Sequence, residues 1–474
     1  MTDVLHLIDG KWVAGEGDDL PIIGPIDGNV IGQMACASRA QVNKAVAAAR
    51  IRFDNGIWRN TPIGERRAVL RAIAGDIRAA RDDLARRQML ESGILLSTAQ
   101  MQVDGAAAWF DYFADFLSTV SGKTFDHLPQ ATTLVTQEPI GVCALFSPWN
   151  VPIGLTAIKL APALAAGNSV VVKPSEETPG CTANFVEVVT KSLPDGVLNL
   201  VNGRGADTGA ALANGDVDMI SFTGGHAGGR AVAEAAASRH IPCVMELGGK
   251  SASIIFADCD RERAMQSAVL MAFTNNGEAC LAGSRLLIEE NGADDFIAEL
   301  TQRVEALSVG PPDSADTQIG PLISAAHRDY VAGFYDSARQ EGGKVLCGGE
   351  AIGPGFGISP GAIHVTSPDS RVWCEEVFGP LVAVSTFKTE DEAIRLANDS
   401  RYGLSGYLWT GDASRALRVS KAIRTGTILV NSPFMRELNA PFGGFKASGV
   451  GREGGVWSWN NFTETKTTIL WHGE

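Results

Sequence analysis

The chain has 474 residues, of which 45% are hydrophobic and 20% are charged, as in ordinary globular proteins. Its length predicts two or more domains. The formal net charge of −14 disfavours non-specific binding to nucleic acid or to anionic lipid, and no run of Lys and Arg marks a local basic patch. No stretch approaches the roughly 18 apolar residues that a membrane span requires.

The eight cysteines are scattered and include no CxxC pair, which predicts free thiols in a reducing compartment. Residues 1–6 carry no basic region followed by an apolar run, so no signal peptide is expected. The seven histidines lack the spacing of a metal site. We therefore expect a cytoplasmic protein without a bound metal and without a nucleic-acid or membrane partner.

In chain order, short strands and turns are predicted first, followed by a long helical pattern. Pro62 suits the first helical position and Gly93 suits the stop. Between them, apolar residues recur on one helical face, at Leu70, Ile73, Ile77 and Leu84.

From about residue 140, short apolar runs alternate with helical stretches. The predicted buried strands cover 142–146, 170–172, 198–201 and 219–222, and the helices between them cover 155–164, 182–191 and 231–238. This alternation predicts βαβ units, with a parallel sheet and helices on both of its faces.

A second alternating block follows, with predicted strands at 253–256, 285–288, 382–387 and 427–430. No low-complexity linker separates the two blocks, and their boundary is expected near residues 246–250. Two segments rich in Thr and β-forming residues, 132–138 and 461–470, fit neither block. Ordinary edge strands are one interpretation of these two segments.

The most informative residues for chemistry are Cys280 and Glu246, which lie 34 positions apart. A thiol that attacks a carbonyl carbon needs a second group that activates water and releases the resulting thioester. Each residue lies in a segment that contains glycine, where the backbone can approach a substrate. Together they can supply both halves of such a reaction.

These two segments resemble the nucleophile and general-base motifs of the aldehyde dehydrogenase superfamily. Further motifs of that family occur along almost the whole chain, in the family's order. They are 147–150 (Ser-Pro-Trp-Asn), 173–176 (Lys-Pro-Ser-Glu), 222–224 (Phe-Thr-Gly) with Gly229, 375–380 (Glu-Glu-Val-Phe-Gly-Pro), 441–444 (Pro-Phe-Gly-Gly) and 448–453 (Ser-Gly-Val-Gly-Arg-Glu).

The resemblance implies an α/β fold with a Rossmann-like parallel-sheet cofactor domain, an α/β catalytic domain and a small β oligomerisation flap. It assigns residues 1–118 and 140–248 to the NAD-binding domain and residues 249–455 to the catalytic domain. Residues 119–139 and 456–474 would pair into the flap and bury exposed strand edges. A homo-oligomer, either a dimer or a tetramer, is therefore expected.

The resemblance places Lys173 and Glu176 at the adenine ribose of a nicotinamide cofactor. A carboxylate at the end of a strand can accept hydrogen bonds from the ribose hydroxyls, and it repels the phosphate of NADP. NAD is therefore the expected cofactor, with NADP as the alternative.

The turn that contains Gly224, with Gly229 five positions on, resembles the family's phosphate-side turn. Gly225 stands where a serine is usual, which removes one candidate hydroxyl donor to the pyrophosphate. The resemblance also assigns Glu376 to the nicotinamide ribose and Phe378 to the nicotinamide ring. Trp149 is expected to pack near the cofactor, with an ordinary core tryptophan as the alternative interpretation.

The chemical step implied by the resemblance begins with attack of the Cys280 thiolate on an aldehyde. The side-chain amide of Asn150 and the backbone N–H of Cys280 would hold the oxyanion. Hydride would leave for the nicotinamide, and water activated by Glu246 would hydrolyse the thioester. Lys159 and Glu453 match family positions of a proton relay, although an ordinary ion pair is a second interpretation.

For the substrate, Ala279 and Leu281 flank the nucleophile and present apolar side chains. Arg436 lies in a segment that resembles the branch of the family that oxidises muconate-type semialdehydes, where an arginine grips the distant carboxylate. Glu437 could neutralise it, and the region near Met101 lacks the second arginine of that branch. Aromatic or aliphatic aldehydes remain an alternative, in a pocket lined by Trp109, Phe110 and Phe434.

Two other functions are compatible with this fold. In a CoA-acylating relative, CoA takes the acyl group in place of water, but that branch generally lacks the base that Glu246 represents. A catalytically silent structural protein is the second alternative, and intact Cys280, Asn150 and Glu246 argue against it.

Overall fold

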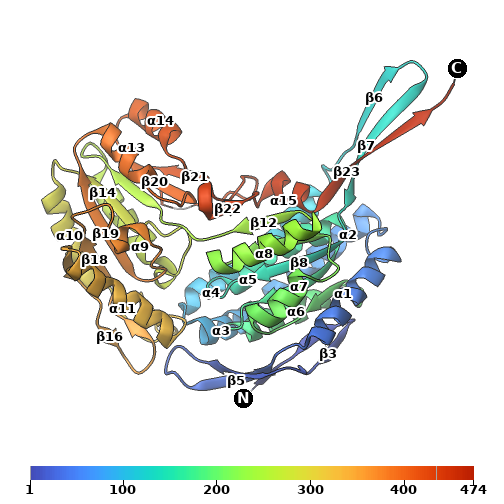
Figure 1. The fold of residues 1–474 in the computed structure, drawn as a ribbon, viewed down its shortest axis with the longest axis horizontal. Helices are drawn as coiled ribbons and strands as arrows, with labels where there is room; N and C mark the ends of the chain where they lie inside the picture. Colours follow the sequence, from blue (N-terminus) through green and yellow to red (C-terminus); the bar gives the residue numbers. More distant parts are fainter. Residues whose placement is uncertain (1, 434, 474) are drawn as a thin grey trace.

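The computed structural model describes residues 2–433 and 435–473, and this part of the chain forms two large sheets covered by helices and a projecting β ribbon (Figure 1). Most neighbouring strands of the two large sheets are parallel, so the predicted α/β class is confirmed. Among the described residues, no helix has the length and apolar character that a membrane crossing demands.

The first large sheet has eight strands, and its centre is parallel as predicted. Its strands in spatial order are β22 (Gly449–Val450), β12 (Cys243–Glu246), β11 (Met219–Thr223), β8 (Val142–Ser147), β9 (Ser169–Pro174), β10 (Leu198–Leu200), β2 (His6–Ile8) and β3 (Lys11–Val13). A separate three-stranded sheet beside it contains β1 (Thr2–Val4), β5 (Val30–Ala35) and β4 (Asp19–Ile23).

Helices cover both faces of this sheet because alternate residues of a strand point to opposite sides. Val170 and Val172 of β9 belong to one apolar core and Val171 to another. The first core contains α2 (Ile63–Ala79), α3 (Arg81–Ser92), α4 (Leu96–Phe116), α5 (Pro152–Ala166) and α6 (Pro179–Thr190). The second contains α1 (Arg39–Asp54), α7 (Ala210–Ala213) and α8 (His226–Arg239).

The long helix predicted between Pro62 and Gly93 is in fact two helices, so this prediction was wrong in one respect. Pro62 caps α2, and Gly93 ends α3 in the left-handed conformation with φ 74°. The chain breaks at Ala80, and the two acidic residues that follow Arg81 favour the start of a new helix. Leu84 therefore belongs to α3.

The second large sheet has seven strands, and all neighbours except β15 and β18 are parallel. The strands in spatial order are β15 (Lys344–Cys347), β18 (Gly361–His364), β19 (Leu381–Phe387), β14 (Arg285–Glu289), β13 (Ala252–Ile255), β20 (Ser405–Trp409) and β21 (Thr427–Val430). Its larger helices are α9 (Arg261–Phe273), α10 (Ala293–Glu305), α11 (Ala325–Gln340), α13 (Glu390–Asn398) and α14 (Ala413–Ala422). The short elements are α12 (Arg371–Cys374), β16 (Ala351–Ile352) and β17 (Gly357–Ile358).

The two segments that fitted neither block pair with each other. β7 (Ala131–Pro139) and β23 (Thr463–Trp471) are antiparallel over their whole length, and β6 (Lys123–Leu128) completes a ribbon that projects from the body of the molecule (Figure 1). Just before β23, α15 (Gly455–Asn461) packs on α5, and β22 joins the edge of the first sheet beside Glu246. Late parts of the chain therefore return to the end of β12.

Candidate active site

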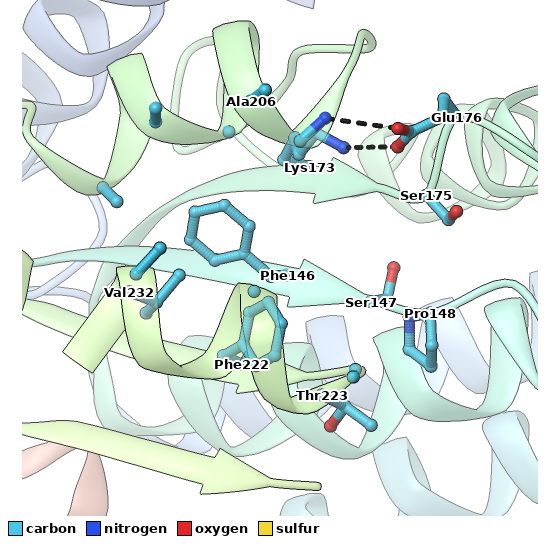
Figure 2. Close-up of a pocket in the computed structure, with 18 of the residues that line it drawn as sticks. Phe146, Ser147, Pro148, Lys173, Ser175, Glu176, Ala206, Phe222, Thr223 and Val232 are labelled. Carbon is cyan, nitrogen blue, oxygen red and sulfur yellow. Dashed lines mark hydrogen bonds and ion pairs between the residues drawn. The ribbon is translucent and has the colours of Figure 1, made fainter. Parts of the chain in front are cut away.

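A cavity of about 510 Å³ opens where three strands of the first sheet end (Figure 2). Ser147 ends β8, Thr223 ends β11, and Lys173 is the last residue but one of β9; all three line the cavity. Ligands of parallel α/β sheets bind at the carboxyl ends of the strands. The cavity therefore lies where a dinucleotide is expected.

Lys173 and Glu176 meet at one wall of this cavity (Figure 2). Lys173 Nζ donates to Pro174 O at 2.8 Å and lies 3.4 Å from Glu176 Oε2, while Gly205 N donates to Glu176 Oε1 at 3.3 Å. Burial opposes ionisation of Glu176, but the Lys173 charge and these donors outweigh it and lower the pKa of the carboxyl. Glu176 is therefore a carboxylate at neutral pH.

The polar atoms in the rest of the wall fit a polar ligand. Ser147 Oγ and Thr223 Oγ1 are buried without a hydrogen-bond partner among the described residues. Gly224 and Gly225 line the cavity at the start of α8, and a Cβ at Gly225 would meet nothing within 4 Å. The two orphaned hydroxyls are candidate donors that the sequence analysis did not assign, and they can compensate for the serine missing at Gly225.

A second cavity of about 160 Å³ adjoins the first and shares Trp149, Gly224 and Gly225 with it. Its lining includes the three residues predicted to react with the substrate and the two predicted on the nicotinamide side, namely Asn150, Glu246, Cys280, Glu376 and Phe378. Residues from five separate parts of the chain thus meet at one site.

The loop that carries Cys280 is held in an unusual backbone conformation. Asn275, Asn276 and Gly277 have φ values of 53°, 59° and 73°, a left-handed run that asparagine and glycine tolerate best. The Cys280 carbonyl oxygen lies 2.2 Å from the position that a Cβ on Gly249 would take. Glycine at position 249 therefore lets the loop approach the segment that follows Glu246.

Hydrogen bonds between amides hold Asn150 against this loop. Asn150 Nδ2 donates to Glu278 O at 2.8 Å, and Asn275 Nδ2 donates to Asn150 O and to Glu278 O, both at 3.1 Å. Gln102 Nε2 of α4 in turn donates to Asn275 Oδ1 at 3.0 Å. Gln102 and Asn275 were not predicted from the sequence, although the Asn-Asn-Gly run at 275–277 is a visible signal of left-handed backbone.

The environment of Cys280 and Glu246 favours their neutral forms. Burial, together with the charges of Glu376 and Glu246, raises the pKa of the Cys280 thiol to about 12. Glu246 is only 4% exposed, and neither carboxyl oxygen has a hydrogen-bond partner among the described residues. Burial and the nearby Glu453 charge raise its pKa well above the ordinary value, and Lys159 only partly offsets them.

Behind Glu246, Lys159 and Glu453 form a buried ion pair with Nζ and Oε1 2.5 Å apart. Lys159 Nζ also donates to Ser221 Oγ at 3.1 Å. Both charged side chains are almost completely buried, so each compensates the other in place of solvent. Ser221, at the centre of β11, is a further member of this cluster that the sequence analysis did not identify.

Comparison with known proteins identifies the family. The aldehyde dehydrogenase family pattern matches residues 12–468. The chain belongs to this family. Family membership confirms the predicted enzyme class, an NAD(P)-dependent aldehyde dehydrogenase.

Individual relatives cover almost the entire chain. The 2-aminomuconic 6-semialdehyde dehydrogenase of a Pseudomonas species is 40% identical, over 98% of this chain and 97% of its own. The betaine aldehyde dehydrogenase of Bacillus subtilis is 39% identical, over 97% of this chain and 96% of its own. A solved structure of Staphylococcus aureus betaine aldehyde dehydrogenase in complex with NAD+ matches with a TM-score of 0.97 and 35% identity, covering 99% of this chain and 95% of that one.

In this aldehyde dehydrogenase, aromatic rings and Glu376 close one side of the second cavity, the side predicted to face the nicotinamide. Trp149 packs edge-on against Phe378 at 5.3 Å and against His327 at 5.6 Å between ring centroids. Gly249 N donates to Glu376 Oε1 at 2.8 Å. Burial raises the pKa of Glu376 to about 7, more than these contacts lower it.

Several predicted residues do not line either cavity. Gly229 lies inside α8, where a Cβ would come within 2.6 Å of the Leu247 side chain, so this glycine allows close packing of the helix. Ala279 and Leu281 flank Cys280 outside both linings. Phe110 follows Trp109 in α4, and consecutive residues of a helix point about 100° apart. Phe110 is fully buried and faces Phe185, so its prediction as a pocket residue was wrong. Phe434 lies outside the described residues.

Arg436 is exposed, and its guanidinium carbon lies 5.2 Å from the ring centre of Trp109 and 4.9 Å from that of Phe442. Glu437 does not neutralise it, because Glu437 Oε1 accepts from Asn439 instead and no described carboxylate lies within 4 Å of the Arg436 nitrogens. The charges of Glu453 and Glu246 act on the guanidinium from beyond ion-pair distance, so its charge is partly compensated.

Proposed function

We propose that this protein is an NAD-dependent, non-acylating aldehyde dehydrogenase that converts an aldehyde into a carboxylic acid. One observation carries the proposal: Cys280, Glu246 and Asn150 line a single small cavity that adjoins the cavity at the strand ends. A nucleophile, a base and an oxyanion donor within one enclosed space are the groups that such a reaction needs.

The reaction starts when Cys280 Sγ gives its proton to solvent water and bonds to the aldehyde carbon. The new oxyanion accepts hydrogen bonds from Asn150 Nδ2 and from the backbone N–H of Cys280. When NAD is bound, its nicotinamide accepts the hydride that leaves this carbon. Glu246 then takes a proton from water, which attacks the thioester and releases the acid and the free thiol. The raised pKa of Glu246 means that its ionised form, once present, is a stronger base for this step.

The cofactor assignment rests on the wall formed by Lys173 and Glu176. The carboxylate is ionised and lies beside the cavity, where it can accept two hydrogen bonds from ribose hydroxyls. The same charge repels a ribose phosphate, so NAD is preferred to NADP. Lys173 and the adjacent hydroxyls of Ser147 and Thr223 would supply donors to the cofactor.

For the substrate, we propose an aldehyde that carries a distant carboxylate. The guanidinium of Arg436 supports this assignment, because it lies beside Trp109 and Phe442 and forms no ion pair within 4 Å among the described residues, and so does the similarity to a muconic semialdehyde dehydrogenase. Uncharged aromatic or aliphatic aldehydes are the second candidate, which the buried Trp109 beside Arg436 favours.

Water rather than CoA is the proposed acyl acceptor, and the cavity shared by Glu246 and Cys280 supports this choice.

The projecting ribbon supports a homo-oligomer, because it exposes large apolar residues of β6 and β23. The eight cysteines of the chain are free, which agrees with a reducing compartment, and we propose a cytoplasmic enzyme.

The proposal is tested by following NADH formation with a panel of aldehydes, with and without CoA. We expect oxidation without CoA, and no turnover by Cys280→Ala although this variant still binds NAD. A requirement for CoA would replace hydrolysis by acyl transfer. An enzyme that binds NAD but oxidises no aldehyde would support the silent structural alternative.

A further inference from the structure

The side chain of Glu278 is completely enclosed, two residues before Cys280 in the nucleophile loop (residues 275–280). Its exposed fraction is 0%, and its Oε1 accepts a hydrogen bond of 2.9 Å from Ile323 N. Oε2 has no hydrogen-bond partner in the part of the chain that the structure describes. Burying a carboxyl costs free energy, and one hydrogen bond recovers only part of it. An apolar side chain would suit stability better here, so the carboxyl is explained by function.

The carboxyl of Glu278 is uncharged. Among the described residues, one basic group lies within 4 Å of it, the imidazole of His327, whose Nε2 is 3.9 Å from Oε1. That nitrogen carries its hydrogen towards Phe378 O, at 2.7 Å, because a carbonyl oxygen can only accept. Burial raises the pKa of Glu278 well above its ordinary value and lowers the pKa of His327. Both groups are therefore neutral, and the carboxyl acts as a hydrogen-bonding group rather than as a charge.

The backbone of the same residue holds Asn150. Glu278 O accepts from Asn150 Nδ2 at 2.8 Å and from Asn275 Nδ2 at 3.1 Å. The Asn150 amide is one predicted donor to the oxyanion, and the backbone N–H of Cys280 is the other. Such donors act fully only within about 2.7–3.1 Å of the oxyanion. A displacement of Glu278 would therefore misplace both donors at once.

The segment that contains Ile323 attaches the nucleophile loop at a second point. The buried side chain of Asn276 accepts from Gly320 N at 2.8 Å. Directly after Ile323, the Ser324 side chain caps the N-terminus of α11, a helix of 16 residues. Residues 320–323 are thus continuous with a long helix, which gives the loop a firm support.

The first turn of α11 also holds a residue that lines the second cavity. Phe378 has a φ of 55°, a left-handed backbone conformation that a phenylalanine keeps only when its surroundings hold it there. His327 of α11 supplies one such contact through its hydrogen bond to Phe378 O. The two loops also touch, because a Cβ on Gly277 would lie 2.3 Å from the Gly379 backbone. α11 therefore fixes the nucleophile loop and the segment around Phe378 relative to each other.

We infer that the uncharged carboxyl of Glu278 sets the oxyanion hole, because it ties the nucleophile loop to α11 through Ile323 N while its carbonyl oxygen aims the Asn150 amide. Glu278 lines neither cavity, so it is a positioning residue that acts through the two donors. The inference rests on the proposed aldehyde oxidation and deepens it. It requires an acceptor at position 278 but no charge.

Glu278→Gln and Glu278→Leu separate the acceptor from the charge and from the volume. Glutamine keeps an acceptor for Ile323 N, so the rate of the NADH burst, measured by stopped flow, should stay within about threefold of the wild type. Leucine fills similar space without an acceptor, and the burst rate should fall about 10- to 100-fold, less than for complete loss of a donor. KM for NAD should change less than about threefold in both variants, because the cavity at the strand ends is untouched.

A double-mutant cycle with Asn150→Ala distinguishes positioning from a merely structural role. If Glu278 acts through the Asn150 amide, most of the loss caused by Glu278→Leu should disappear when residue 150 is already alanine. We expect a remaining decrease of about threefold or less, which reports on the backbone N–H of Cys280.

The control variant Glu91→Leu removes another completely buried carboxyl, whose partners Arg87 and Cys181 N lie outside the nucleophile loop. It should lower the urea midpoint and leave the burst rate within about twofold of the wild type. If Glu278→Leu does not fold, Glu278→Asp takes its place. Aspartate is one methylene shorter, so it loses the contact with Ile323 N, and the same loss and the same cycle are expected.

Three results would overturn the inference: a Glu278→Gln enzyme as slow as Glu278→Leu, a Glu278→Leu enzyme with the wild-type burst rate, or losses that multiply in full with Asn150→Ala. Each of them leaves aldehyde oxidation intact. If the wild type oxidises no aldehyde, the proposed function itself fails, and the inference fails with it.

Discussion

Asn150 Nδ2 donates a hydrogen bond of 2.8 Å to the carbonyl oxygen of Glu278, a residue 128 positions later in the chain. The bond fixes the amide beside the loop that carries Cys280. It joins the segment that follows β8 of the first sheet to the loop between α9 and β14, which belongs to the second sheet. The remaining amide hydrogen of Asn150 is the one available for a substrate oxygen.

Replacing Asn150 by Ala should lower kcat by about 10² to 10³-fold, because one donor to the oxyanion is lost. NAD binding, measured by fluorescence titration, should not change. Gln102→Leu should give a smaller decrease, since Gln102 acts through Asn275. An Asn150→Ala enzyme with wild-type kcat would remove Asn150 from the reaction.

Replacing Glu246 by Gln should separate the two halves of the reaction. The first turnover should still release NADH as a burst, and steady turnover should fall about 10² to 10⁴-fold, because water is no longer deprotonated. Stopped-flow absorbance measures both phases. Wild-type steady rates in this variant would contradict the role of Glu246 as the base.

The raised pKa of Cys280 predicts a distinctive pH dependence of alkylation in the enzyme without ligands. Only the thiolate reacts with iodoacetamide, and a pKa of about 12 keeps the thiol protonated below that pH. The rate at Cys280 should therefore rise about tenfold per pH unit up to pH ~10, whereas a small free thiol levels off above its ordinary pKa of about 8.5. Mass spectrometry at residue 280 gives the rate, and a plateau near neutral pH would be inconsistent with this environment.

Lys159→Met should destabilise the protein by about 3–5 kcal/mol, because it leaves the buried Glu453 without its partner. The double variant Lys159→Met with Glu453→Gln should recover part of this loss. Urea denaturation of the wild type, Lys159→Met, Glu453→Gln and the double variant gives the coupling free energy. Additive effects of the two substitutions would mean that the pair makes no joint contribution.

Ile469→Asp with Trp471→Asp should reduce the molecular mass in solution by weakening the association of subunits through β23. Both side chains are exposed, at 61% and 71%, and share one face of the strand. Analytical ultracentrifugation measures the change. The matched control is Leu417→Asp, which places a charge on an equally exposed leucine of α14. Unchanged mass in the double variant would mean that the ribbon does not hold subunits together.

Much of the fold followed from local pattern. The strands expected at 142–146 and 285–288 are present as β8 and β14, because continuous apolar runs of this length are stable only between two layers of helices. The break at Ala80 was not foreseen, since the apolar spacing continues across it; α2 and α3 both pack on α4, on either side of the turn. Gln102 was also missed, because its partner Asn275 is 173 positions away.

The sequence by itself determined which groups are available for the reaction: a cysteine and a carboxylate in glycine-containing segments, and Lys173 and Glu176 just after a predicted strand. These features depend on neighbours in the chain. Only the tertiary structure decided that Glu246 lies buried without a hydrogen-bond partner in the described part of the chain, and that Arg436 rests on Trp109. Ionisation and aromatic contact depend on the groups that surround a side chain in space, and here those groups come from segments hundreds of residues apart.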